Sequence, residues 1–149
     1  MSLEENRLIR PARLSDAPAI TELLSQLGYP DEIPNVSARL KTLVAREDTG
    51  VLVAEVAGQV SALAAYQLME LLERHQPQCR ITTLVVHADA RRQGLARSLL
   101  ERIATIATER SCFRLEVTTQ ARRVDAARLY SALGFEERPR RLVKTLPRP

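Results

Sequence analysis

Apolar residues recur along this chain at two spacings, one typical of helices and one typical of strands. The first helical run follows Ser15-Asp16-Ala17-Pro18, where a polar residue and a proline predict a helix start, and Gly28 predicts its end. A second helix is predicted to begin near Asn35 or Ser37. The runs at helical spacing are Ile20, Leu23, Leu24 and Leu27; Val36, Leu40, Leu43 and Val44; and Leu95, Leu99, Leu100, Ile103, Ile106 and Ala107.

Shorter apolar runs between these segments predict strands. The residues Ala57-Gly58-Gln59 separate two of them and predict a β-hairpin. The run from Arg80 to Val86 is rich in β-branched residues and is apolar on both faces at its end, which is typical of a central strand. The predicted strands are 8–12, 51–56, 60–69, 80–86, 112–117 and a last one at 141–146 that follows Phe135.

A further helix is predicted from Asp125 to Leu133, with Gly134 at its end. The predicted order is β-α-α-β-β-β-α-β-α-β, which indicates an α/β (α+β) fold. The 149 residues are close to the common size of one domain. We therefore expect a single domain over residues 4–147.

Composition narrows the class of protein. Apolar residues make up 45% and charged residues 27%, which is ordinary for a globular protein. No apolar run approaches the roughly 20 residues needed to span a membrane, and the N-terminus has no apolar signal region. These features predict a cytoplasmic protein without a membrane partner.

The sequence shows no metal-ligand spacing among its cysteines and histidines, which are Cys79, Cys112, His75 and His87. We therefore expect buried thiols and no metal.

The positive charge is concentrated at the C-terminus. The last twelve residues carry five basic residues and no acid, and these five charges exceed the net charge of +4. Such a tail either contacts an anionic partner or protects a strand edge by charge, and the second interpretation is favoured. Only 3% of residues are aromatic, so a stacking surface for nucleic acid is disfavoured.

The segment from Leu84 to Ser98 carries the candidate chemistry. A predicted strand, Leu84-Val85-Val86, leads through a polar turn into a long helix. The first N–H groups of a helix lack intrahelical partners and attract phosphate. Gly94 allows close approach to the backbone. Acids usually occupy the start of a helix. Here the helix start carries three arginines instead, Arg91, Arg92 and Arg97. This pattern predicts a site for a diphosphate.

Two motifs in the chain resemble the GCN5-related N-acetyltransferase (GNAT) family. The family signature Arg/Gln-x-x-Gly-x-Gly/Ala is matched by Arg91, Gly94 and Ala96. The block from Arg123 to Phe135 is similar to the family's Asp-Ala-x-x-Phe/Leu-Tyr-x-x-Leu-Gly-Phe segment. The resemblance covers nearly the whole chain, and it implies a mixed, mostly antiparallel central sheet flanked by helices.

The resemblance also implies acetyl-coenzyme A as cosubstrate and direct attack of a primary amine on its thioester. The pantetheine arm would pair with the backbone of the motif-bearing strand, the diphosphate would bind the N–H groups from Arg92 to Arg97, and Tyr130 would be the general acid. The implied cofactor-binding residues are Leu84, Val85, Val86, Arg91, Arg92, Gln93, Gly94, Leu95, Ala96, Arg97 and Ser98.

The chain departs from the family pattern at two places. Thr82 and Thr83 stand where many members carry a glutamate that serves as the general base. Glu70, Glu116 or an ordered water are the alternatives, whereas His87 is interpreted as a loop residue. Arg123 replaces a common asparagine, which leaves that contact with coenzyme A open.

The acceptor is not specified by the sequence. It is expected to be a small-molecule or peptide amine, bound in the family by the first two helices and their loop, where Asp31 and Glu32 are interpreted as solvated. Two alternatives to this function stay open: an acyl-coenzyme A-binding module without catalysis, and a protein- or tRNA-directed acetyltransferase. The oligomeric state is also open, with a homodimer through the C-terminal strand as one alternative.

Overall fold

The computed structural model describes residues 6–117, 124–138 and 141–148. Its contacts divide the chain into two compact units, Met1–Thr119 and Gln120–Pro149, and each is described by itself. The strands of the first unit are β1 (Arg7–Pro11), β2 (Thr49–Val56), β3 (Gln59–Met69), β4 (Gln78–Val86) and β5 (Arg114–Val117). Its helices are α1 (Ala17–Leu27), α2 (Ile33–Val44) and α3 (Leu95–Glu109), with the short 3-10 helices η2 (Leu14–Asp16) and η3 (Ala88–Ala90). The second unit contains α4 (Val124–Ala132).

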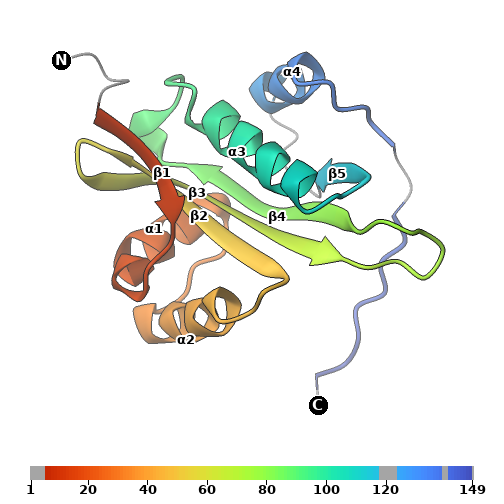
Figure 1. Ribbon diagram of the computed structural model, residues 1–149. Coiled ribbons are helices and arrows are strands. Elements are labelled where there is room, and N and C mark those ends of the chain that lie inside the picture. The colour runs from red at the N-terminus through yellow and green to blue at the C-terminus, as the bar shows by residue number, and fades with distance from the viewer. Residues whose placement is uncertain (1–5, 118–123, 139–140, 149) are drawn as a thin grey trace. The chain divides into compact units, whose positions relative to one another are not determined.

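The strands form one sheet in the order β1-β2-β3-β4-β5 (Figure 1). All neighbours pair antiparallel except β4 and β5, which are parallel. The hairpin between β2 and β3 closes through Ala57 and Gly58, both with positive φ, at 51° and 80°. This two-residue turn matches the right-handed twist of the strands. The predicted mixed, mostly antiparallel sheet is thus confirmed, as is the hairpin.

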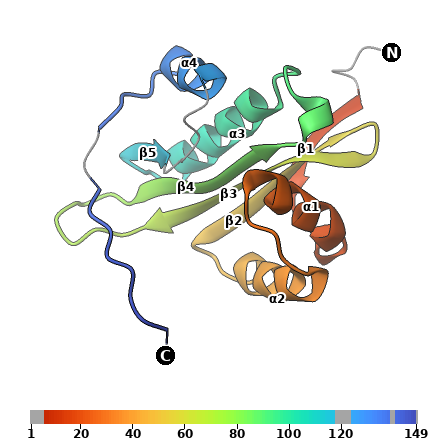
Figure 2. The same ribbon diagram turned by 180° about the vertical axis from the view of Figure 1, so that it is seen from behind.

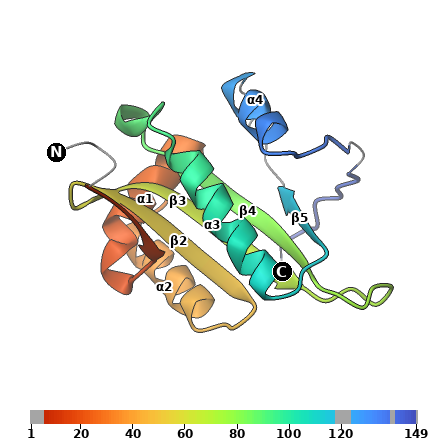
Figure 3. The same cartoon turned by 45° about the horizontal axis from the view of Figure 1, so that its top comes forward.

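Helices cover both faces of the sheet. Helices α1 and α2 lie on one face, and α3 lies on the other, as the front, back and tilted views show (Figures 1, 2 and 3). The core under α1 and α2 joins buried residues of both helices to Val51, Val53, Leu63 and Val85 of the sheet. Burying each such side chain contributes roughly 1.5–3 kcal/mol. Helix α3 buries the face predicted from its spacing, namely Leu95, Leu99, Leu100, Ile103 and Ala107.

Several element boundaries differ from prediction; strands β2 and β4, for example, begin two residues early, at Thr49 and Gln78. Two other differences have a local cause. Helix α2 begins at Ile33, earlier than expected, because Pro34 occupies its first turn, where a missing N–H costs nothing. Strand β5 begins at Arg114 instead of Cys112. The Cys112 N–H donates to the Ala107 carbonyl at 2.9 Å, so this residue still closes the end of α3.

The second unit is built on α4, which ends near Gly134 as predicted. The strand predicted at 141–146 is wrong, because residues 141–148 show no regular secondary structure. Their apolar side chains stand in solvent, with Leu142 99% and Val143 71% exposed. A strand needs a hydrogen-bonded neighbour, and the described part of this unit offers only a helix.

Candidate active site

Among the described residues, strand β4 has an outer neighbour along its first half only. Its pairing with β5 runs from Gln78 opposite Arg114 to Ile81 opposite Val117. Residues 83–86 pair with β3 on one side, and no strand of the described residues pairs with them on the other. Within the described part of the chain, the second half of β4 therefore presents backbone groups at an edge. The predicted site residues Leu84, Val85 and Val86 lie in this half.

The same point of β4 carries a β-bulge. Thr83 lies opposite Ala65 and Ile81 opposite Tyr66, so Thr82 is the extra residue. Its hydroxyl lies 3.4 Å from the Ala65 carbonyl, to which it donates. A bulge bends its strand and re-aims backbone groups. The bulge and the end of the β5 pairing coincide, and the pattern of side chains in the sequence gives no signal for either.

Two residues of the turn after β4 adopt the left-handed backbone conformation. Gly94 precedes α3 with φ 76° and ψ 17°, in the left-handed region, and Arg92 has φ 66°. No side chain of the described residues caps the start of α3, and its first turn contains no acid. Its first N–H groups are therefore available to an anion.

The predicted residues of this turn differ in exposure. Arg91, Arg92, Gly94 and Arg97 are exposed, whereas Leu95 is 1% exposed and belongs to the core. Leu95 can thus contribute only its backbone to a ligand. Arg97 forms an ion pair with Glu101 at 2.9 Å on the helix surface.

Contacts from other elements hold the turn in place. The Arg7 guanidinium donates to the Gln93 carbonyl, which joins the turn to β1. The Ala88 N–H donates to the Gln26 side chain of α1 at 2.9 Å. The Ser98 hydroxyl donates to the Gly94 carbonyl at 3.1 Å. These contacts hold the turn between the edge strand β1 and helix α1, which lies on the opposite face of the sheet from α3.

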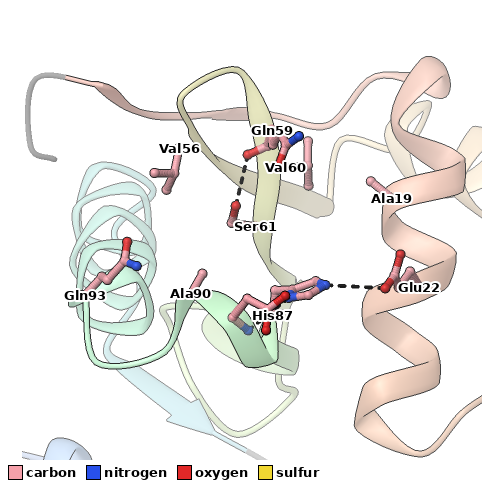
Figure 4. A pocket seen from close by; sticks show the side chains of 10 residues that line it. Ala19, Glu22, Val56, Gln59, Val60, Ser61, His87, Ala90 and Gln93 are labelled. Atoms are coloured by element: carbon pink, nitrogen blue, oxygen red, sulfur yellow. Dashed lines mark hydrogen bonds and ion pairs between the residues drawn. The ribbon is translucent and has the colours of Figure 1, made fainter.

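His87 lies in the loop directly after β4, as predicted. Its Nδ1 accepts from the Asp89 N–H at 3.1 Å, and its Nε2 lies 3.4 Å from the Glu22 carboxylate (Figure 4). It lines a cavity of about 540 Å³ bounded by α1, the β2–β3 hairpin and the turn. With Nδ1 accepting, the proton of the neutral ring is on Nε2 and points toward Glu22.

A smaller cavity lies on the face covered by α1 and α2. Its volume is about 320 Å³, and its wall includes Thr82 and Thr83. Sequence reasoning placed acceptor binding near these helices and the loop that contains Tyr29. It did not predict which apolar side chains border the cavity, because that depends on packing.

The candidate general bases lie away from the bulge or are already engaged. Glu70 is exposed just after β3, whose last residue pairs with the first residue of β4. Glu116 lies 3.0 Å from Arg80 and 3.6 Å from Arg114. Strand β4 itself contains no acid.

Burial disfavours the thiolate form of both cysteines. Neither cysteine is in a disulfide, Cys79 is buried and Cys112 is half-buried. Burial raises the pKa of Cys79 to about 12 and also raises the pKa of Cys112, so neither is a thiolate nucleophile at neutral pH. The described residues contain no group of three metal-ligating side chains. Among them, no helix combines the length and apolarity needed to cross a membrane.

In the second unit, Tyr130 lies half-buried on α4. Its ring packs edge-on against Phe135 with the centroids 5.6 Å apart, and its carbonyl accepts from the Phe135 N–H at 2.9 Å. The C-terminal part of the second motif thus forms a compact helix end. Arg123 lies outside the described residues.

Residues 17–135 match the model of the acetyltransferase (GNAT) family. Comparison with curated proteins gives no match. Among solved structures, the chain is similar to a transcriptional regulator from Bacillus halodurans C-125, with 22% identity, a TM-score of 0.85 and coverage of 94% of this chain and 99% of that chain. It is also similar to a GNAT family acetyltransferase from Staphylococcus aureus, with 20% identity, a TM-score of 0.81 and coverage of 95% and 99%. A third similar structure is an aminoglycoside acetyltransferase from an uncultured soil metagenomic sample, with 19% identity, a TM-score of 0.81 and coverage of 98% and 100%. The TM-scores establish that the chain shares its fold with these proteins, and at such low sequence identity they establish nothing further.

Proposed function

Because the chain belongs to the GNAT acetyltransferase family, we propose that it transfers the acetyl group of acetyl-coenzyme A to a primary amine. One observation carries the proposal: the half of β4 that has no outer partner among the described residues leads, through η3 and the glycine turn, to the uncapped start of α3. Such an arrangement offers an extended arm a strand edge and offers a diphosphate a helix N-terminus.

The residues at this place fit the cosubstrate. The backbone of Leu84, Val85 and Val86 would pair with the pantetheine arm, whose amides need donors and acceptors. The N–H groups from Arg92 to Arg97 would hold the diphosphate, with Arg91, Arg92 and Arg97 adding positive charge. Leu95 supports the site from the core, since its side chain is buried.

The reaction is a direct displacement. The amine nitrogen attacks the thioester carbonyl carbon, a C–N bond forms, and the C–S bond breaks. The sulfur leaves as a thiol with a proton from the Tyr130 hydroxyl, and the nitrogen loses one proton, which restores the tyrosine through solvent. The products are an acetamide and coenzyme A.

Proton removal from the incoming ammonium has no dedicated residue in this proposal. Thr82 and Thr83 cannot accept that proton, and Glu116 is paired with two guanidinium groups. The amine therefore loses its proton to water before attack, and the nucleophile is its neutral form.

The substitution Tyr130→Phe tests the proposal. Removing one general acid lowers rates by roughly 10²–10⁴-fold, so thiol release with an active amine should fall by about 100-fold. The dissociation constant for acetyl-coenzyme A, measured by calorimetry, should stay unchanged.

Three other outcomes would count against parts of this scheme. Equal turnover by wild type and variant would remove Tyr130 from the chemistry. Tight acetyl-coenzyme A binding without turnover of any amine would instead support a binding module without catalysis. Turnover confined to proteins or charged tRNA would identify a macromolecular acceptor.

A further inference from the structure

The cavity of about 320 Å³ under α1 and α2 has the position and size of a small acceptor site. It reaches Thr82 and Thr83, where β4 bulges just beyond its last described pair with β5. Pockets for small molecules measure roughly 300–1,000 Å³, so this cavity is at the low end of that range. It therefore has room for a compact group only.

The wall of the cavity is mainly apolar. Helices α1 and α2 and strand β3 contribute most of it, through Leu24, Leu27, Leu40, Leu43, Leu63 and Ala65. The polar exceptions are Tyr29, Arg39 and the two threonines of β4. No carboxylate is among the described residues that line it. A positively charged group would therefore lose its water without gaining a counter-ion.

Asp31, in the loop between α1 and α2, already has partners, one of which is Arg39 of the cavity wall. Asp31 accepts from the Asn35 side chain at 3.0 Å and from the Glu32 N–H at 2.7 Å, and it forms an ion pair with Arg39 at 2.8 Å. These contacts, led by Asn35, lower the pKa of Asp31 to about 2. Asp31 is thus a partner of Arg39 and not a free anionic group that attracts a cation.

We propose that the acceptor is a primary monoamine whose substituent is a compact, uncharged apolar group seated between α1 and α2. This inference rests on the acetyl transfer proposed above. A monoamine becomes uncharged by losing one proton before attack. A polyamine would keep a second ammonium, which would face an apolar wall and the Arg39 guanidinium.

The first test compares two amines on the wild-type protein. Thiol release from acetyl-coenzyme A is measured with 3-methylbutylamine and with spermidine. We expect kcat/KM to be at least tenfold higher for 3-methylbutylamine. A preference for spermidine would overturn the acceptor inference and leave acetyl transfer intact.

The second test places an acid at the rim of the cavity. Leu27 is 38% exposed, so Leu27→Glu is compatible with folding and sets a carboxylate beside the apolar wall. The ratio of kcat/KM for the two amines should shift at least tenfold toward spermidine. The matched control is Leu8→Glu. Leu8 lies on the edge strand β1, contributes nothing to the cavity wall and is 52% exposed. An unchanged ratio in Leu27→Glu, or an equal shift in Leu8→Glu, would overturn the inference.

A binding measurement separates this inference from the proposed activity. N-(3-methylbutyl)acetamide, the neutral product, is titrated into both proteins in the presence of coenzyme A by calorimetry. It should bind wild type at least tenfold more tightly than Leu27→Glu. If no amine turned over but this difference appeared, acetyl transfer would fail and the apolar specificity of the cavity would stand. Absence of the difference would overturn the inference.

Discussion

At the scale of single residues, the site depends on a backbone conformation that most side chains disfavour. Gly94 has φ 76° and Arg92 has φ 66°, two residues apart in the same turn. Left-handed conformations cost a non-glycine residue about 1–2 kcal/mol. Arg92 already carries this cost in the turn. Because Gly94 avoids the cost at the second position, the turn can bring its backbone N–H groups to the helix start.

Replacing Gly94 should affect the ligand more than the fold. A Cβ on Gly94 would meet only the end of the Arg7 side chain at 3.6 Å, an ordinary contact. The cost of Gly94→Ala is thus conformational, about 1 kcal/mol in the free energy of unfolding. Relief of that strain by a shift of the turn should weaken acetyl-coenzyme A binding at least tenfold, as measured by calorimetry.

Gly58→Ala is the matched control for this prediction. Gly58 has φ 80° and no neighbour within 4 Å of an added Cβ, and it lies in the hairpin turn. It should lose similar stability and keep its affinity for acetyl-coenzyme A. Unchanged affinity in Gly94→Ala would remove the turn from the cosubstrate site.

At the scale of elements, a buried ion-pair network joins β1, η2 and β2. Arg10 donates to both Asp16 oxygens at 2.8 and 2.9 Å and to Glu55 at 2.9 Å. The Arg10 and Asp16 side chains are only 10% and 8% exposed. Asp16 also accepts from the Arg13 N–H at 2.7 Å. The predicted helix-capping residue thus serves a tertiary contact, which fixes where α1 starts against the sheet.

Asp16→Ala should strongly destabilise the fold. Removing one partner of a buried pair costs about 3 kcal/mol or more, measurable by urea unfolding at pH 7. The Arg10 hydrogen bond, with the other contacts of Asp16, lowers the pKa of Asp16 in the folded state. The contribution is therefore complete above the unfolded-state pKa of about 4 and is lost as the pH falls through the lower folded-state value. The difference in stability between wild type and variant should shrink along that range.

Asp48→Ala provides the surface comparison. Its ion pair with Arg46 is 2.9 Å long, as is one of the Arg10–Asp16 contacts. The Arg46 side chain, however, is 51% exposed and that of Asp48 is 47% exposed. Exposed pairs contribute little, so this variant should unfold almost as wild type does. Equal losses in Asp16→Ala and Asp48→Ala would show that burial of the Arg10 network is not what stabilises it.

At the scale of the whole molecule, binding at the β4 edge should be visible as stability. A ligand that binds only the folded state adds about 2.7 kcal/mol at 100 times its dissociation constant. Acetyl-coenzyme A at that concentration should raise the unfolding midpoint of wild type. Gly94→Ala, at the same ligand concentration, should gain less. Equal gains would locate binding elsewhere in the chain.

The sequence specified the local structure closely, because spacing and turn chemistry act over a few residues. The helices, the hairpin at Ala57–Gly58 and the glycine turn before α3 followed from such patterns. The strand expected at 141–146 did not, because pairing with a neighbour decides whether an apolar run becomes a strand.

What the sequence alone determined is therefore the order of elements up to α4, the family and the segment expected to bind the cosubstrate, since these rest on contiguous motifs. Only the tertiary structure showed the bulge at Thr82, the half of β4 without an outer partner among the described residues, and the apolar cavity that adjoins them. It also showed that Asp31 and Glu116 are occupied by arginines. The physical reason is that register, voids and ion pairs arise between segments distant in the chain, where no local pattern records them.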